Sequence, residues 1–189
     1  MEAETIVSII DAERRADPAR KIAVLVRARG HLDALVALIR RRRPDLAFTA
    51  VEIDRLDRRQ PVQDLLSLTK ALFHPADRVS WLAVLRAPWC GLTLADLHAL
   101  AGDDFDATVW SLTNDADRCA RLPADGQGRL AHARAALSEA LAHRGRQPAA
   151  RWIAGTWLLL SGPACLSDAA DAADCEAFLD LVARLAAAG

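Results

Sequence analysis

The chain has little lysine and no phosphate-binding loop. Lysine occurs only at Lys21 and Lys70, whereas arginine fills the other basic positions and alanine is abundant, a pattern typical of a GC-rich coding sequence. A nucleotide phosphate loop requires the pattern G-x-x-x-x-G-K-[ST], in which backbone amides and the lysine hold the phosphates. Neither lysine stands in that pattern. The sequence therefore excludes ATP binding by such a loop within these residues.

Signatures of metal sites and catalytic nucleophiles are absent as well. The sequence has no C-x-x-C pair, no closely spaced His/Cys cluster and no G-x-S-x-G elbow. We expect free, reduced thiols at Cys90, Cys119, Cys165 and Cys175. Surface or half-buried positions are predicted for His74, His98, His132 and His143. The acidic run Asp103, Asp104 and Asp106 is typical of a solvated turn, so we predict no cofactor, metal or catalytic residue in this chain.

Long hydrophobic runs and leader sequences are missing too. The longest uncharged stretch, Trp152–Ser167, is shorter than the ~20 residues of a membrane-spanning helix and is interrupted by Gly162-Pro163. Glu2 and Glu4 stand where a signal peptide would be basic. A cytoplasmic location without membrane contact is therefore predicted.

The charge balance limits any nucleic-acid contact. The formal net charge is -1 and the pI is near 6.5, so the chain lacks the basic excess of an autonomous nucleic-acid-binding domain. With 52% hydrophobic residues it can bury a real core. Any DNA contact must therefore be local.

The first 60 residues alternate between two kinds of hydrophobic pattern. Helical spacing predicts helices at Glu2–Arg15 and His31–Arg43, the second of which ends on four arginines. The apolar run Lys21–Arg27 predicts a strand buried on both faces, and Leu46–Ile53 can form a second strand. The sequence therefore predicts a small α/β segment with a strand-helix-strand unit.

After about residue 60 only helical periodicities remain, separated by Pro or Gly. The predicted helices are Val62–Leu72, Asp77–Leu85, Leu94–Ala101, Phe105–Leu112, Gly128–His143, Ala149–Leu160 and Asp174–Ala188. Thr93, with Asp96 three positions later, has the pattern of a helix N-cap. Loops are predicted at Pro123–Gly128 and Gly145–Pro148. The predicted fold is mainly α, with an α/β part at residues 1–60 and a helical domain at residues 61–189.

Three segments in a fixed order resemble a known family. KIAVLVRARGHLDALVALIRRR followed by LAFTAVE is similar to the strand-helix-strand of the second RecA-like motor domain in superfamily 1 helicases. There the first strand ends in an arginine beside the DNA track, and Arg27 matches it. The next segment resembles the start of the helical insertion of UvrD/Rep and RecB/AddA helicases. Its matching residues are Pro61, Val62, Asp64, Leu65, Leu66, Pro75, Asp77, Trp81, Leu85, Arg86 and Pro88.

The third segment separates two branches of that family. The sequence from Gly91 to Leu97 is similar to the G-L-[ST]-x-x-[DE]-L of the RecB/AddA, or exodeoxyribonuclease V-like, branch. UvrD and Rep relatives instead carry a G-I-G turn that grips duplex DNA by its backbone. Thr93 stands where the second glycine of that turn would fall. The RecB/AddA branch is therefore the better match.

The resemblance implies a non-catalytic piece of an ATP-dependent DNA helicase or helicase-nuclease acting in recombination and double-strand break repair. It covers residues 1 to about 100. The parent enzyme would use ATP and Mg²⁺, and the partners would be DNA at a single/double-strand junction, the remaining helicase domains and a nuclease domain or subunit. This chain would be inactive alone. The alternatives are a stand-alone helical adaptor for protein–protein interaction and a small enzyme that uses a reactive cysteine.

The resemblance and the residue types indicate candidate DNA contacts at Arg27, Arg29, Arg86, Trp89, Gly91 and Thr93. Two of these candidates also have a plainer interpretation. Arg27 can be a solvated arginine at a strand end, and Trp89 can stack on a base or lie beneath the following helix. The run Arg40–Arg43 can neutralise phosphates or end a solvated helix. Arg55, Arg58 and Arg59 can face DNA or pair with Asp54 and Asp57.

Overall fold

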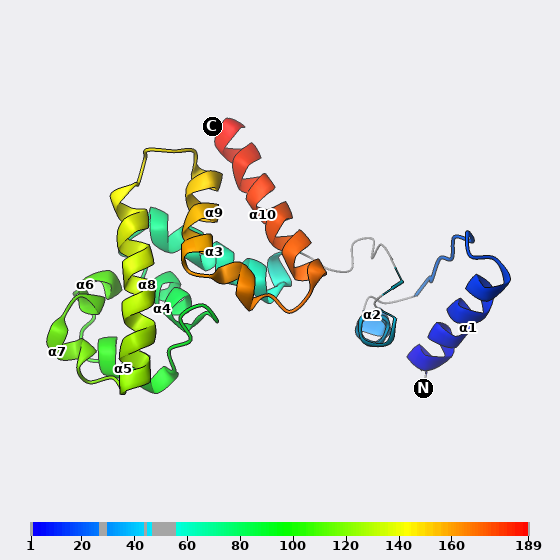
Figure 1. Cartoon of the computed structure of the whole chain (residues 1–189), viewed down its shortest axis with the longest axis horizontal. Coiled ribbons are helices and arrows are strands. Elements are labelled where there is room, and N and C mark those ends of the chain that lie inside the picture. The colour runs from blue at the N-terminus through cyan, green and yellow to red at the C-terminus, as the bar shows by residue number, and fades with distance from the viewer. Residues whose placement is uncertain (1, 27–29, 44, 47–55, 189) are drawn as a thin grey trace. The chain divides into compact units, whose positions relative to one another are not determined.

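The computed structural model describes residues 2–26, 30–43, 45–46 and 56–188. The chain divides into two compact units, Met1–Arg55 and Leu56–Gly189, and each is described by itself (Figure 1). The division falls close to residue 60, where the sequence changes from mixed to purely helical patterns.

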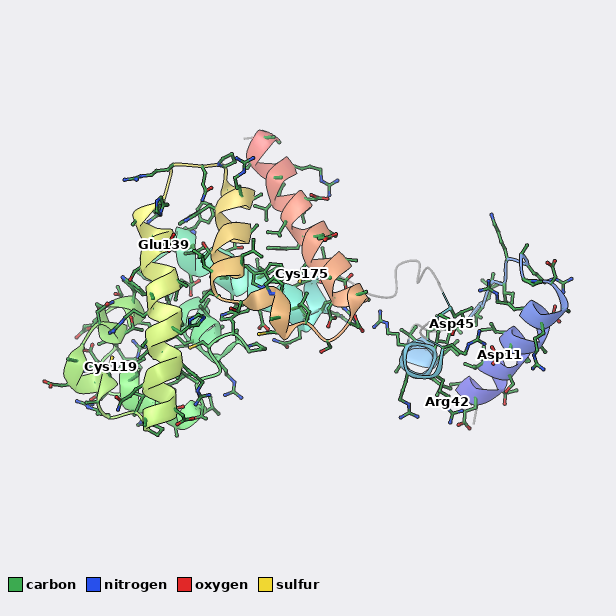
Figure 2. All side chains as sticks on the ribbon, in the orientation of Figure 1. Asp11, Arg42, Asp45, Cys119, Glu139 and Cys175 are labelled. Atoms are coloured by element: carbon green, nitrogen blue, oxygen red, sulfur yellow. The ribbon has the colours of Figure 1, made fainter. Side chains whose placement is uncertain are left out.

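The first unit is built on two packed helices, α1 (Glu2–Ala16) and α2 (Gly30–Arg42). Both carry apolar residues at helical spacing, and these form a small core of Val7, Ile10, Leu32, Leu35 and Ile39. The last basic residues of α2 reach α1: Arg42 pairs with Glu4 at 3.1 Å, and Arg43, just beyond the helix, pairs with Asp11 (Figure 2). Charge pairs thus reinforce the contact between the two helices.

The strand predicted at Lys21–Arg27 is not shown. Residues 21–26 have no regular secondary structure, and Leu25 is 93% exposed although the apolar run predicted burial on both faces. A buried parallel strand needs neighbouring strands for its backbone and helices on both faces. Most of the second predicted strand, Leu46–Ile53, lies outside the described residues, as does Arg27. The fold shown is therefore mainly α.

The second unit is helical throughout its described residues. Its helices are α3 (Gln60–Phe73), α4 (Arg78–Arg86), α5 (Leu94–Ala101), α6 (Val109–Thr113), α7 (Ala116–Cys119), α8 (Ala124–Ala142), α9 (Ala149–Leu159) and α10 (Ala169–Ala188). Short 3-10 helices occur at Leu56–Arg58 (η1) and Gly162–Cys165 (η2). α3 is central, because it packs against α4, α9 and α10.

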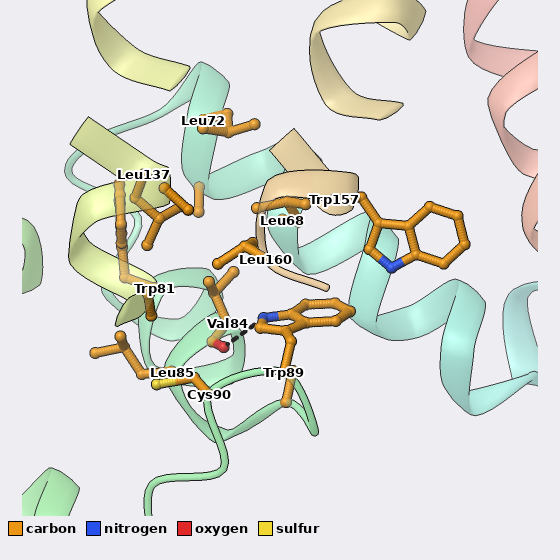
Figure 3. Packing of buried hydrophobic residues seen from close by; sticks show 14 of the residues in the cluster. Leu68, Leu72, Trp81, Val84, Leu85, Trp89, Cys90, Leu137, Trp157 and Leu160 are labelled. Carbon is orange, nitrogen blue, oxygen red and sulfur yellow. Dashed lines mark hydrogen bonds between the residues drawn. The ribbon is translucent and has the colours of Figure 1, made fainter. Parts of the chain in front are cut away.

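The core of this unit is formed where these helices meet (Figure 3). Leu68 and Leu72 of α3 and Trp81 of α4 are fully buried. The Trp81 ring lies 5.3 Å from that of Trp110, centroid to centroid. Trp152 of α9 donates its indole N–H to the carbonyl of Ala140 at 2.7 Å, which ties α9 to α8. Trp81, Trp152 and Trp157 are all buried, as the apolar spacing of their helices favours.

Two local predictions in this unit are wrong, and one short helix was not predicted. The helix predicted at Phe105–Leu112 begins only at Val109, because residues 104–108 form an irregular turn. The segment Pro123–Gly128, predicted as a loop, forms the first turns of α8, with Pro123 at the N-cap position. Gly126 is buried, and its Cα faces the Asp96 side chain, so tertiary packing offsets the low helix propensity of glycine. The four-residue α7 was missed, because one turn leaves no periodicity to detect.

No helix in the part of the chain that the structure describes is both long and apolar enough to cross a membrane. The stretch Trp152–Ser167 instead forms α9 and η2. The positions predicted for His74, His98, His132 and His143 are confirmed, because all four are exposed.

Candidate functional site

The connection from α4 to α5 brings several candidate residues together. α4 ends at Arg86, and the chain then reverses so that Gly91 N–H donates to the Ala87 carbonyl at 2.7 Å and Leu92 N–H to the Leu85 carbonyl at 3.0 Å. Gly91 has a φ of +65°, a backbone conformation that side chains disfavour. The geometry of the turn therefore accounts for this glycine.

An open depression lies over this turn. It has a volume of about 640 Å³ and is lined by Arg86, Gly91, Leu92, Thr93, Leu94 and Ala95. Three candidate DNA contacts, Arg86, Gly91 and Thr93, thus share one surface. The Arg86 side chain is exposed and makes no ion pair with any residue of the described ranges. It is the cation that this depression offers to an anionic ligand.

Thr93 has a structural task at the start of α5. Its side chain accepts a hydrogen bond from the Asp96 N–H at 3.1 Å, and the Asp96 carboxylate accepts one from the Thr93 N–H at 2.9 Å. This is the predicted capping box, now confirmed. It uses two backbone donors at the helix N-terminus and places a carboxylate there, which weakens the attraction of this helix end for an anion.

Sequence reasoning missed Arg129. This residue of α8 donates to the carbonyl of Gly91 and pairs with Asp125 at 2.9 Å and with Asp96 at 3.9 Å. It lies 38 residues from Gly91 in the sequence, so no local pattern signals the contact. Its charge is compensated by the two carboxylates, and its structural effect is to hold the turn against α8.

Trp89 points away from the depression. It is 9% exposed, and its indole N–H donates to the carbonyl of Val84 at 3.0 Å (Figure 3). The ring therefore lies in the core and does not present a face to a base in the depression. Of the remaining candidates, Arg27 and Arg29 lie outside the described residues.

The arginine run at the end of α2 is partly paired. Besides the pairing of Arg42 with Glu4, Arg43 pairs with Asp11 and with Asp45 at 2.7 Å. The hydrogen bond from Arg43 lowers the pKa of Asp45, and the same bond raises the pKa of Arg43. Charges compensated in this way attract phosphate less than free arginines do.

A second concavity lies on another side of the turn. It has a volume of about 310 Å³ and is formed by the start of α3, the α4–α5 turn, the segment from α9 through η2 to Ser167, and α10. Trp89, Trp157, Pro61 and Pro88 supply apolar walls, and Arg58, Arg59, Asp64 and Asp171 supply charge. Sequence reasoning did not predict this pocket.

Arg59 joins two distant parts of the chain beside this pocket. It donates to Asp171 at 2.9 Å and to Asp174 at 2.8 Å, both on α10. The sequence offered DNA or neighbouring aspartates as its partners, and the structure adds two aspartates that lie more than 100 residues away. The Arg59 side chain is only 17% exposed, and its two ion pairs fix the start of α3 against α10.

The acidic residues after α5 form ion pairs and hydrogen bonds within the protein. Asp103 and Asp104 pair with Arg118 of α7, and Asp104 also accepts the backbone N–H groups of Asp106 and Ala107. Over the described residues, no group of three or more His, Cys, Asp or Glu side chains is arranged to hold a metal ion.

The four cysteines are free thiols, as expected. Burial raises the pKa of Cys90 to about 11, and burial together with nearby aspartates raises the pKa of Cys175 to about 11. Both therefore remain protonated at neutral pH, the opposite of what an activated nucleophile requires.

Comparison with known proteins identifies no relative. No family model, no curated protein and no solved structure matches this chain. Any statement of function therefore depends on the residues themselves and on the sequence pattern.

Proposed function

We propose that this chain is part of an ATP-dependent DNA helicase or helicase-nuclease of the UvrD/Rep and RecB/AddA kind. Residues 1–60 would belong to the second RecA-like motor domain and residues 61–189 to its helical insertion. ATP and Mg²⁺ would bind elsewhere in the parent protein. The chain would contribute contacts with duplex DNA near a single/double-strand junction, or with neighbouring helicase or nuclease domains, during recombination and break repair.

One observation supports the DNA contact most directly. Arg86, one of the residues that match the start of the helical insertion, is exposed and lies in the same open depression as Gly91 and Thr93. Leu94 and Ala95, the first residues of α5, line the same surface. An arginine beside helix N-terminal amides is a common arrangement for contacting a phosphate.

The opposing charges limit the strength of such a contact. Asp96 lies at the start of α5, and Arg129 is already paired. With few free cations and no residue placed to read a base edge, binding would be weak, independent of sequence and sensitive to salt.

The test is binding of the full chain to a forked DNA, followed by fluorescence anisotropy over a series of salt concentrations. Arg86→Ala should weaken binding. It should also make the slope of log K against log salt concentration about one unit less steep, because one phosphate contact is lost. The matched control is Arg151→Ala, which removes an exposed arginine on α9 outside the depression. Equal effects of the two substitutions, or no binding by the unaltered chain, would contradict the assignment.

A second candidate function is a helical protein–protein adaptor. Its support is four exposed leucines on the last two helices, Leu158 (63%), Leu159 (42%), Leu181 (39%) and Leu185 (65%). The two helices run antiparallel (Figure 1), so the two pairs lie toward opposite ends of this helix pair. Small separate patches are common on monomers, and this arrangement favours the adaptor less than one continuous patch would.

The size of the native polypeptide separates the two proposals. An antibody raised against this chain should detect a band far above 20.5 kDa if the chain is part of a helicase. A band at 20.5 kDa would overturn that proposal and make the adaptor the leading candidate.

A further inference from the structure

We propose that the pocket lined by Asp64, Trp89 and Trp157 binds a small organic cation, such as an alkylammonium or alkylguanidinium group. This inference is independent of the proposed helicase role. The pocket volume of about 310 Å³ is at the lower end of the range for small-ligand sites, and its walls come from four separate segments of the chain. A small ligand therefore fits it better than a folded partner.

Asp64 is the residue that points to a cation. It is 9% exposed and lines the pocket from the first turn of α3. Its Oδ1 accepts a hydrogen bond from Gln60 at 2.8 Å, whereas its Oδ2 accepts none from any residue in the described ranges. Oδ2 keeps some accessible surface, and Asp64 is among the residues that line the pocket. A largely buried carboxylate whose second oxygen has no donor from the protein favours a charged donor from outside.

The aromatic walls favour the same ligand class. Trp89 and Trp157 both line the pocket, and Figure 3 shows their indoles next to each other at one side of the core. Each is more than nine-tenths buried. The face of an indole attracts a cation, and this attraction is stronger where water is excluded. A cation in this pocket would therefore meet a carboxylate and two indoles among the side chains that line it.

The other charges around the pocket do not cancel this preference. Arg59 is compensated by Asp171 and Asp174, which leaves Asp64 and the exposed Arg58 as the remaining charges. Solvent and salt screen the charge of an exposed guanidinium, whereas the nearly buried carboxylate is screened much less. Of the charges that line the pocket, the Asp64 carboxylate is therefore the one that is neither paired with an opposite charge nor fully exposed to solvent.

Binding should depend on pH in a defined direction. Burial raises the pKa of Asp64, and the hydrogen bond from Gln60 opposes that rise only in part. The charged groups that line the pocket with it are Arg58, Arg59 and Asp171, and Cys175, which is close enough to interact with it, stays protonated at neutral pH. A bound cation favours the ionised carboxylate, so affinity should fall as the pH falls through the raised pKa of Asp64.

The experiment follows the indole N–H resonances of the ¹⁵N-labelled full chain by NMR. The N–H of Trp157 has no acceptor among the described residues, so its resonance should report on the pocket. Butylguanidinium should shift the Trp157 resonance in a saturable manner. Butylurea, its neutral isostere, should bind at least tenfold more weakly. Equal binding of the two would overturn the proposal, because it would indicate an apolar pocket without charge preference.

Two substitutions with the same change in net charge separate the pocket from general electrostatics. Asp64→Asn should reduce the affinity for butylguanidinium at least tenfold, whereas Glu139→Gln, on the exposed side of α8 (Figure 2), should leave it unchanged. Similar behaviour of the two variants would overturn the proposal. Trp157→Phe provides a second test if Asp64→Asn fails to fold, because it should also weaken binding of butylguanidinium.

A peptide tests the size of the ligand. A pentapeptide with a central arginine between glycines carries the same guanidinium but a bulky backbone on both sides. It should bind at least tenfold more weakly than butylguanidinium. Tighter or equal binding of the peptide would overturn the assignment to a small ligand.

Discussion

Single atoms decide whether some positions tolerate change. Gly162 lies against Trp157 so closely that a Cβ atom would come within 1.9 Å of the indole Nε1. Gly155, in the middle of α9, has nothing within 4 Å of the corresponding position. A side chain therefore has room at Gly155 but none at Gly162, and the sequence alone does not show this difference.

Gly162→Ala should destabilise the protein by about 2 kcal/mol or more, because the added methyl group forces Trp157 out of its position in the core. Gly155→Ala is the control and should stabilise it by about 0.5–1 kcal/mol, because alanine is the better helix former. Urea unfolding followed by circular dichroism measures both. A neutral Gly162→Ala would mean that Trp157 can move without loss of packing.

The four thiols should react at very different rates with a disulfide reagent at neutral pH. Cys165 is exposed and should react first, whereas Cys90 and Cys175 are buried, with pKa values of about 11, and should react only after unfolding. Cys165→Ser should abolish the fast phase. Rapid modification of either buried thiol in the folded protein would support the third alternative, an enzyme with a reactive cysteine.

At the scale of the element, capping explains where helices begin. Asp77, Thr93, Thr108 and Asp115 each accept a hydrogen bond from a backbone N–H in the first turn of the helix that follows. Such side chains satisfy amides that have no partner within the helix. These caps are local and are visible in the sequence.

Thr93→Ala should cost about 1 kcal/mol of stability, because it removes one half of the capping box of α5. Thr93→Ser retains the hydroxyl and should restore most of the loss. The measurement is again urea unfolding, combined with the DNA titration. Thr93→Ala could instead weaken DNA binding without lowering the free energy of unfolding, while Thr93→Ser binds DNA like the unaltered chain. That result would replace the capping role with a direct contact to DNA.

The link between α5 and α7 should weaken in acid. Hydrogen bonds from Arg118, and to a smaller extent from Arg121, lower the pKa of Asp103 from 3.8 to about 2. Since the folded-state value is depressed, the contribution is present above pH 3.8 and is lost as the pH falls toward 2. Asp103→Asn should therefore show a smaller loss of stability over that interval than the unaltered chain. Parallel acid titrations of the two proteins would contradict this assignment.

At the scale of the whole molecule, the chain holds two separate hydrophobic cores, one in each compact unit. Among the residues that the structure describes, the members of each core belong to one unit. A substitution in one core should therefore destabilise the unit that contains it and leave the other unit unaffected.

Leu65→Ala, at a fully buried position of α3, should destabilise the second unit by about 3 kcal/mol. Amide hydrogen exchange should accelerate in α3, α4, α9 and α10 and stay unchanged in α1 and α2. Val7→Ala is the converse substitution and should affect α1 and α2 alone. Acceleration throughout the chain by either substitution would show that the two units unfold together.

The sequence by itself determined most helices of the second unit. The predicted Leu94–Ala101 is the observed α5, and the predicted Ala149–Leu160 differs from α9 by one residue. Periodicity, prolines and caps are properties of neighbouring residues, so they can be read without a structure. The absence of a phosphate loop and of zinc-ligand spacing is local information as well.

Only the tertiary structure decided which residues meet. Arg59 pairs with Asp171 and Asp174, and Arg129 holds the carbonyl of Gly91. Trp89 turns into the core and lines a pocket with Trp157. These contacts join helices that are distant in the sequence, and they depend on how whole helices pack. Hydrophobic periodicity shows which face of a helix is buried but not which other helix covers it.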